Sequence, residues 1–243
     1  MRRVSAALAA GCAALAAAVA AKPGAAAPGA AMGESLAPHR AVYDITLARS
    51  APGSGVADLS GRMVYELAGS ACEGFTQNMR FVTRLTNRDG EAQVSDLRTS
   101  SWEDAAGKRL RFNSSQYRDE RLEDATQGDA GRTPGSATVR VELTKPEKKR
   151  IDLASGVYFP IQHTTALLAS ARDGRNVFLA DLYDGSEKGD KVYQTSAFIG
   201  QRAAPGKVVI DKESDTAGVL TGLPSWPIAI SYYEPGAETA AAL

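Results

Sequence analysis

The stretch that decides the fold is "FTQNMRFVTRLTNRDGEAQVSDLRTSSW", which runs from Phe75 to Trp102. Apolar side chains in its first half fall at odd-numbered positions: Phe75, Met79, Phe81 and Leu85. Because side chains alternate between the two faces of a strand, this spacing predicts a half-buried β-strand. "NRDG", Asn87 to Gly90, supplies a turn with glycine where a positive φ is needed. The chain then runs back, so we predict a long antiparallel hairpin.

The same alternation extends from this hairpin in both directions along the chain. It precedes the hairpin in "HRAVYDITL" (39–47) and "GRMVYEL" (61–67). Strand patterns recur later in "RLRFNSSQYR", "ATVRVELTK", "IDLA", "NVFLADLYDG", "KVYQTSAFIGQ", "KVVIDKE" and "PIAISYYE". About ten to twelve strands joined by consecutive hairpins imply antiparallel pairing. We therefore predict a mainly β fold whose antiparallel sheet closes or curls, since this removes exposed edges.

Two segments depart from this alternation. "DERLEDATQGDAGRTPG", Asp119 to Gly135, is polar and rich in glycine and aspartate, so we predict a loop with at most one short edge strand at its start. "FPIQHTTALLASARDG", Phe159 to Gly174, instead places apolar residues at helical spacing. Pro160 suits a first helical turn, and Gly174 can end the helix. This segment predicts one short amphipathic helix, about 160–172, that lies against the sheet.

The N-terminus has the parts of a secretory signal peptide: two arginines, an uncharged run from Val4 to Ala21, and small residues at a cleavage site. We predict a signal peptide over residues 1–20, export to the periplasm, and no membrane span after cleavage. A retained anchor and a lipoprotein with its lipid on Cys12, in "LAAGC", are the alternatives. Residues 21–37 are rich in alanine, proline and glycine and predict a disordered leader. We expect residues 38–235 to form a single domain and 236–243 a disordered tail.

Composition and charge exclude several classes of protein. Lysine plus arginine number 28 and aspartate plus glutamate number 28, so the basic surplus that nucleic-acid binding needs is missing. The histidines and cysteines are too few and too dispersed for a structural zinc site. No G-x-S-x-G, G-x-G-x-x-G or phosphate-loop motif is present. We therefore predict no metal, no cofactor and no nucleic-acid partner.

Two polar features leave alternatives open. His39 or His163 could meet a carboxylate and a hydroxyl from elsewhere in the chain, which would make a periplasmic hydrolase with a site assembled from scattered residues. The simpler interpretation of His163 is a helix residue that bonds to a neighbouring loop. "DLYDGSEKGDK", Asp181 to Lys191, lacks the ligand spacing of a calcium loop and predicts a polar hairpin turn.

Several segments together resemble a known family. "LAPHRAVYDITL", "GRMVYEL", "ACEGFTQNMRFVTRL", "GVYFPIQHT", "LYDGSEKGDKVY" and "FIG", in this order, are similar to the periplasmic cell-envelope integrity proteins of the EipB type. The resemblance covers roughly Leu36 to Tyr233. It implies one domain built as a β-spiral, a single strongly curved antiparallel sheet wrapped around one helix. It also implies a role in maintaining the envelope, with no established enzymatic activity.

The resemblance also bears on the ligand. Such spirals are similar in shape to periplasmic lipoprotein carriers, so the resemblance implies an amphiphile or a partner protein of the envelope as the ligand. We expect a concave apolar face inside the curved sheet, formed by Tyr43, Phe81 and Leu168. The chain is thus predicted to be a non-catalytic binding protein. A purely structural protein with no ligand is the remaining alternative.

Cys72, in "ACEG", has a role that only the resemblance implies. Members of the family join the matching cysteine by a disulfide to a second cysteine close to their C-terminal end. No cysteine follows Cys72 in this sequence. We therefore expect a C-terminally shortened version of the family, from a frameshift, an early stop or genuine divergence. In an oxidising compartment the odd thiol of Cys72 is also free to form a dimer.

Overall fold

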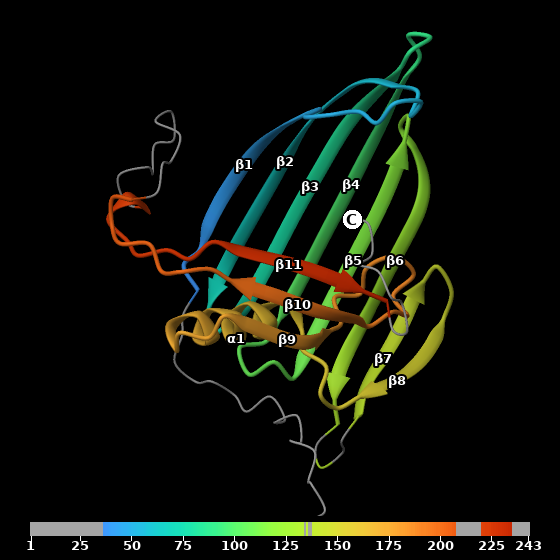
Figure 1. Cartoon of the computed structure of the whole chain (residues 1–243). Helices are drawn as coiled ribbons and strands as arrows, with labels where there is room; N and C mark the ends of the chain where they lie inside the picture. The colour runs from blue at the N-terminus through green and yellow to red at the C-terminus, as the bar shows by residue number, and fades with distance from the viewer. Residues whose placement is uncertain (1–35, 134, 136–137, 208–219, 235–243) are drawn as a thin grey trace, which may run out of the picture.

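The computed structural model describes residues 36–133, 135, 138–207 and 220–234, which form eleven β-strands and one α-helix (Figure 1). The first eight strands are β1 (His39–Thr46), β2 (Val56–Ser70), β3 (Gly74–Asn87), β4 (Ala92–Glu103), β5 (Arg109–Arg118), β6 (Arg121–Arg132), β7 (Thr138–Lys145) and β8 (Lys149–Ala154). They are followed by α1 (Pro160–Arg172), β9 (Val177–Leu182), β10 (Tyr193–Ile199) and β11 (Ile228–Tyr233). The predictions of a mainly β fold and of a helix over 160–172 are confirmed.

β1 to β8 form one antiparallel sheet in which every strand pairs with its neighbours in sequence. The predicted hairpin is at its centre, where β3 and β4 pair with Phe81 opposite Leu97. Gly90 has a φ of 85° in the turn, a conformation that favours glycine. The long strands bend, so that one face of the sheet is concave (Figure 1). The sheet is not closed, because β1 and β8 stand at its two ends.

β9, β10 and β11 form a second, smaller antiparallel sheet in the order β11-β10-β9. It lies with α1 on the concave face of the large sheet, and its strands run across those of β1 to β4 (Figure 1). Tyr158, just before α1, joins Leu182 at the end of β9 by a parallel bridge. The two sheets differ from the single sheet that the family resemblance implies. The curvature and the antiparallel pairing agree with it.

A buried glutamate at the end of β4 holds the start of α1. The backbone N–H groups of Ile161 and Gln162 donate to the two carboxyl oxygens of Glu103, at 2.7 and 3.1 Å. The first turn of a helix leaves these donors without partners inside the helix. The guanidinium of Arg132 on β6 donates to the carbonyl oxygen of Val157 and to Gln162 Oε1, at 2.6 and 2.8 Å. The helix start is therefore bound to two separate strands of the large sheet.

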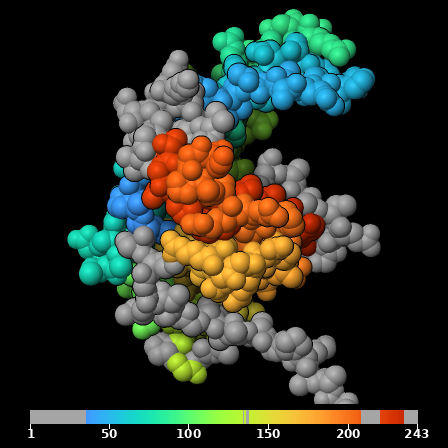
Figure 2. Space-filling model, turned by 60° about the vertical axis from the view of Figure 1, so that its left-hand side comes forward, coloured from blue at the N-terminus to red at the C-terminus, as the bar shows by residue number. Residues whose placement is uncertain are grey.

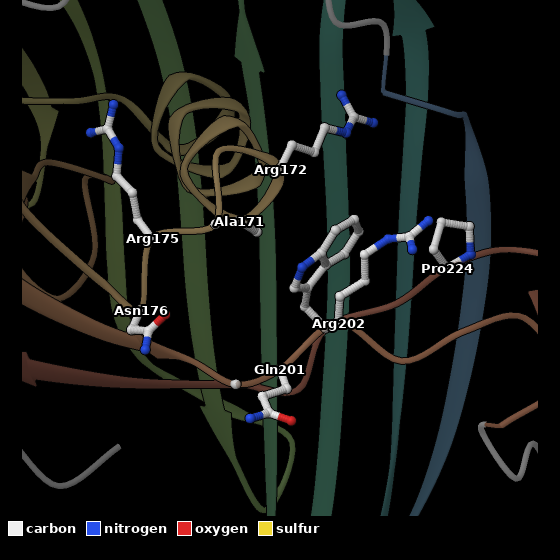
Figure 3. Close-up of a pocket in the computed structure, with 10 residues that line it drawn as sticks. Ala171, Arg172, Arg175, Asn176, Gln201, Arg202 and Pro224 are labelled. Atoms are coloured by element: carbon white, nitrogen blue, oxygen red, sulfur yellow. The ribbon is translucent and has the colours of Figure 1, made fainter.

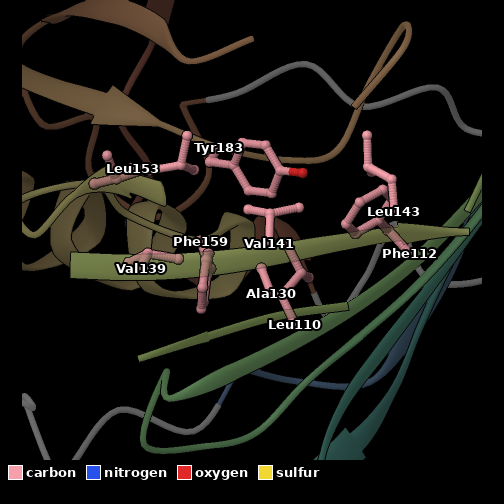
Figure 4. Close-up of a cluster of buried hydrophobic side chains, with 10 residues drawn as sticks. Leu110, Phe112, Ala130, Val139, Val141, Leu143, Leu153, Phe159 and Tyr183 are labelled. Atoms are coloured by element: carbon pink, nitrogen blue, oxygen red, sulfur yellow. The ribbon is translucent and has the colours of Figure 1, made fainter. Parts of the chain in front are cut away.

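The main core lies between β5–β8 and the segments that follow them (Figure 4). Tyr183 is completely buried there, with its ring edge-on to Phe112 at 5.8 Å between centroids. Its hydroxyl donates to the carbonyl oxygen of Gly189 at 2.8 Å. The predicted polar turn over 181–191 does connect paired strands, β9 and β10, but it also contributes to this core. The buried members are Leu110, Phe112, Ala130, Val139, Val141, Leu143, Leu153, Val157, Phe159 and Tyr183.

The prediction of a loop over Asp119–Gly135 is wrong. Most of this segment is β6, an interior strand of the large sheet that pairs with both β5 and β7. A Cβ at Gly128 would lie 2.7 Å from Phe112 Cζ, so glycine is the residue that leaves room for that ring. The inner-facing side chains of β6 are small, which hides the strand pattern in the sequence: Thr126, Gly128 and Ala130.

Several predictions concern residues outside the described ranges. They are the signal peptide over 1–20 with Cys12 and its lipoprotein alternative, all of the leader over 21–37 except its last two residues, the tail over 236–243, and most of the "KVVIDKE" strand. These remain predictions. Within the residues that the structure describes, no helix is both long and apolar enough to span a membrane.

Candidate binding surface on the concave face

The concave face of the large sheet has two regions that differ in what covers them. At one end of the strands α1 and the small sheet pack on it, and Leu67 and Phe75 are buried against Ile161 of α1. At the other end the strands continue past β11, and Figure 2 shows their tips overhanging the small sheet above a hollow. We define the covered half by Leu67, Phe75, Glu103, Leu110 and Phe112. We define the open half by Tyr43, Ile45, Leu59, Met63, Phe81, Leu85 and Leu97.

One cross-strand row of apolar side chains runs through the open half. In register, Tyr43 of β1 lies opposite Met63 of β2, which lies opposite Phe81 of β3, which in turn lies opposite Leu97 of β4. Directly opposed residues have Cβ atoms about 4.5–5.5 Å apart, so these four side chains form a continuous strip. Tyr43 is 49% exposed, and the other three are half-buried. We call this row the apolar strip.

Polar groups follow the apolar strip toward the strand tips. Thr83 on β3 lies opposite Ser95 on β4, and the side-chain amide of Gln116 donates to Ser95 Oγ at 2.7 Å. Beyond them Leu59 lies opposite Leu85. Arg118 of β5 lies opposite Ser95 and pairs with Glu123 at 3.0 Å. This part of the inner face therefore offers apolar area interrupted by hydrogen-bonding groups, an arrangement that suits an apolar ligand with a small polar part.

β11 lines the other side of the hollow. Its residues Ile230 and Ile228 lie opposite Ala197 and Ile199 of β10 and share their face of the small sheet. Ala197 and Ile199 are buried against α1, so this face is turned toward the large sheet. Ile228 and Ile230, on the outermost strand, are each 36% exposed. Apolar side chains thus face the hollow from both sheets.

His163 does not have the hydrogen bonds of a catalytic base. Its Nε2 lies 2.8 Å from Thr195 Oγ1, and that hydroxyl donates its one proton to the carbonyl oxygen of Ala180 at 2.9 Å. Nε2 therefore carries the proton of the pair and cannot accept one from Thr195. Burial lowers the pKa of His163 to about 4, so the ring is neutral at pH 7. The expected role as a helix residue bonded to a neighbouring segment is confirmed, although that segment is β10 rather than a loop.

His39 is also without the partners of a catalytic histidine. It is exposed at the start of β1, with Nδ1 2.8 Å from the carbonyl oxygen of Ala37 and its ring 5.6 Å from that of Tyr65. Within the described ranges, neither histidine hydrogen-bonds to a carboxylate. In the same residues, no group of three or more histidine, cysteine, aspartate or glutamate side chains is placed to hold a metal ion.

Cys72 is exposed in the turn between β2 and β3. Its backbone N–H donates to Ser70 Oγ at 3.4 Å. The part of the chain that the structure describes holds no disulfide partner for it. Its pairing within the family and a dimer through its thiol therefore stay predictions.

Two of the three residues predicted for a concave apolar face lie in the apolar strip. Tyr43 and Phe81 flank Met63 across three neighbouring strands. Leu168 is half-buried on α1 and is not part of the row. The face as a ligand site, with or without Leu168, stays a prediction.

Sequence reasoning missed four residues that line the hollow. One of them, Leu97, could have been found from the "NRDG" turn, which sets the register of the hairpin. In the structure Asn87 N–H donates to the carbonyl oxygen of Glu91 at 2.9 Å. Extending that register along the strands places Phe81 opposite Leu97. The alternation of β2 places Met63 on the inner face of that strand. No pattern in the sequence predicts that β11 crosses the large sheet. The missed residues are Met63, Leu97, Ile228 and Ile230.

Comparison with known proteins links the whole folded region to one family. The family model described as EipB-like matches residues 30–242, which include all the described strands and α1. The cell envelope integrity protein EipB of Brucella abortus (strain 2308) is 39% identical over 205 residues, which cover 84% of this chain and 71% of the relative. A crystal structure of a β-barrel-like protein of domain of unknown function DUF1849, from Brucella abortus, matches with a TM-score of 0.75 and 39% identity. That match covers 83% of this chain and 82% of the solved chain.

Proposed function

The chain belongs to the EipB-like family, and on this premise we propose that it maintains cell-envelope integrity as a non-catalytic binding protein. The name of the Brucella relative supports the envelope role. The predicted signal peptide supports a location in the periplasm. The open half supports binding, and we take its ligand to be an amphiphile whose apolar chain lies along the apolar strip.

The apolar strip is the observation that carries the proposal. Apolar surface in contact with water costs about 25 cal/mol per Å², and a ligand chain placed between the two sheets would remove water from both sides. Ile228 and Ile230 lie on the face of β11 that is turned toward the large sheet, so an acyl chain between the sheets would meet apolar groups from both. Thr83 and Ser95 lie beyond the strip, where a polar end group finds hydrogen-bonding partners. An apolar segment of a partner protein is the other ligand to which the family resemblance points.

A hydrolase is the function that the geometry favours less. Its site needs a histidine that can accept a proton from a hydroxyl and that a carboxylate orients. His163 donates to Thr195 instead, and His39 bonds only to a backbone carbonyl within the described residues. These contacts support the non-catalytic function.

Titration calorimetry with dodecylphosphocholine, kept below its micelle concentration, tests the proposed surface. We expect Phe81→Asn to weaken binding about tenfold, because the chain loses contact with a large apolar side chain in the strip. Val82→Asn is the matched control, since Val82 is the next residue on β3 and faces away from the hollow. It should bind as the wild type does. Equal affinity in all three proteins would place the ligand elsewhere.

A deletion strain tests the envelope role. We expect the deletion to sensitise cells to detergents and to cell-wall antibiotics. A plasmid copy of the wild type or of Val82→Asn should restore resistance, and one of Phe81→Asn should not. Wild-type resistance in the deletion strain would contradict the envelope role, whereas full rescue by Phe81→Asn would contradict only the role of the strip.

A further inference from the structure

A second apolar surface lies on the small sheet, on the face turned away from the hollow. Val177, Leu179 and Phe198 are 52%, 69% and 60% exposed. Val177 lies opposite Phe198, and Leu179 is the next residue on the same face of β9, so the three side chains are neighbours. The opposite face of this sheet already supplies the core, through Ala197 and Ile199. We call these three exposed residues the outer patch.

An arginine-lined pocket adjoins the outer patch. It has a volume of about 480 Å³ and lies between the C-terminal end of α1 and the chain that follows β10. Ile199 N–H donates to the carbonyl oxygen of Asn176 at 2.8 Å, and these residues directly adjoin Phe198 and Val177 in the chain. The pocket and the patch therefore share an edge. The polar and aromatic residues that line the pocket are Arg172, Arg175, Asn176, Gln201, Arg202 and Trp226.

The pocket concentrates positive charge in a chain whose basic and acidic residues number 28 each. Of the described residues that line it, none is acidic. Arg175 lies 3.3 Å from Asp173, but both side chains are well exposed, so water screens this pair and leaves the guanidinium available. Figure 3 shows Arg172 and Arg202 extending to one side of the pocket and Arg175 to the other. Guanidinium groups spread in this way do not converge on one small anion. They suit a layer of anionic groups.

We propose that the outer patch and the arginine-lined pocket together dock the protein on an anionic lipid surface. The three apolar side chains enter the interface between headgroups and acyl chains, and Arg175 and Arg202 bind lipid phosphates. Asp181, the acidic residue on the same face of β9, lies at the end of the strand away from the pocket. Charge along the face therefore favours an approach with the pocket end toward the lipid. This surface is distinct from the apolar strip, so the proposal does not depend on the ligand of the open half.

Sedimentation with vesicles tests the proposal, using the full chain under reducing conditions to prevent dimers through Cys72. The wild type should bind vesicles made of equal amounts of phosphatidylglycerol and phosphatidylcholine. It should bind vesicles of pure phosphatidylcholine much more weakly. The double variant Leu179→Ser/Phe198→Ser should bind the anionic vesicles at least about tenfold more weakly. Arg175→Gln/Arg202→Gln should lose about fivefold for each arginine. Raising the salt from about 0.05 to 0.5 M should weaken the wild type and should affect the arginine variant less.

Matched controls separate this surface from the rest of the chain. Val42→Ser/Leu122→Ser removes two residues of the large sheet that are also exposed, and Arg111→Gln removes an exposed arginine of β5, so these variants should bind as the wild type does. The N-terminal segment is the same in all variants, so binding through it persists in each of them. Phe81→Asn should bind dodecylphosphocholine more weakly and should bind the anionic vesicles as the wild type does. Equal binding to neutral and anionic vesicles, or equal binding by the outer-patch variants and their controls, would overturn the proposal.

Discussion

The covered and open halves lie on the same strands, yet their inner-facing residues have different surroundings. On β2, Leu67 is 4% exposed because Phe75 and Ile161 pack around it. Leu59 lies on the same face of the same strand and is only half-buried. The strand pattern is alike in both halves, and the difference comes from α1 and the small sheet, which cover one end. One end of the sheet therefore serves as the core, and the other retains apolar surface that a ligand can use.

The covered half also encloses polar groups that join the layers. Glu103 accepts two hydrogen bonds from the start of α1, and His163 of α1 bonds to Thr195 of β10. In the open half the apolar strip is followed by uncharged Thr83 and Ser95. Stability and pH dependence should therefore depend mainly on the covered half, and binding on the open half.

The largest expected effect comes from shortening one leucine in each half. Leu67→Ala should lower the free energy of unfolding by about 3 kcal/mol, because it leaves a cavity against Phe75 and Ile161. Leu59→Ala should cost about 1 kcal/mol or less, because its side chain is already partly in water. Urea denaturation measures both. Equal losses would mean that the two halves are equally packed.

The pH dependence of stability tests the contact between Glu103 and α1. Burial raises the pKa of Glu103 from 4.5 to about 8. A pKa that is higher in the folded state gives a stability that is complete below about 4.5 and declines as the pH rises to about 8. The decline amounts to about 1.4 kcal/mol for each unit of pKa difference.

Glu103→Gln supplies the control, because the amide keeps an acceptor oxygen for the helix N–H groups and does not titrate. The free energy of unfolding, measured in urea at pH 5, 7 and 9, should fall with pH more steeply in the wild type than in the variant. The same slope in both proteins would show that this buried carboxyl group does not set the pH dependence of the covered half.

The smallest effect is expected on the outer face, behind the apolar strip. Asp96 accepts from Arg80 and Arg98 at 2.8 and 2.7 Å, and these hydrogen bonds lower its pKa to about 2. Both arginines are more than half exposed, so Asp96→Asn should cost less than about 1 kcal/mol at pH 7. A lowered pKa stabilises above about 4, so the cost should vanish as the pH falls toward 2. A loss of several kcal/mol in urea denaturation would mean that ion pairs, rather than packing, hold the open half.

Local patterns were sufficient to predict much of the fold. The hairpin over Phe75–Trp102 and the helix over 160–172 follow from alternation, turn residues and helical spacing, all of which depend on near neighbours. The sequence did not predict β6, because the ring of Phe112 packs on the inner face of this strand and leaves room only for glycine at 128. The apolar alternation of a strand is therefore missing there. The division into two sheets depends on where α1 places the chain, and no local pattern contains that information.

The candidate surface could be predicted only in part. Tyr43 and Phe81 were found because each is a large apolar residue on a clear strand face. From the sequence alone Glu103 is only a polar residue at the end of a strand. Its contact with α1 could not be predicted, because its partners lie 58 and 59 positions further along the chain. In the sequence Ile228 and Ile230 have only the pattern of ordinary strand residues. Their place across the hollow depends on the packing of the small sheet against α1.

Backbone amide chemical shifts, recorded during a titration with dodecylphosphocholine below its micelle concentration, would locate the ligand on the large sheet. If the apolar strip binds the ligand, the largest shift changes should occur at Met63, Phe81 and Leu97, with smaller changes at Ile228 and Ile230. Amides of the covered half, such as those of Leu110 and Phe112, should stay unchanged. Shift changes that concentrate in the covered half, or the absence of any change in the apolar strip at saturating ligand, would contradict binding at the strip.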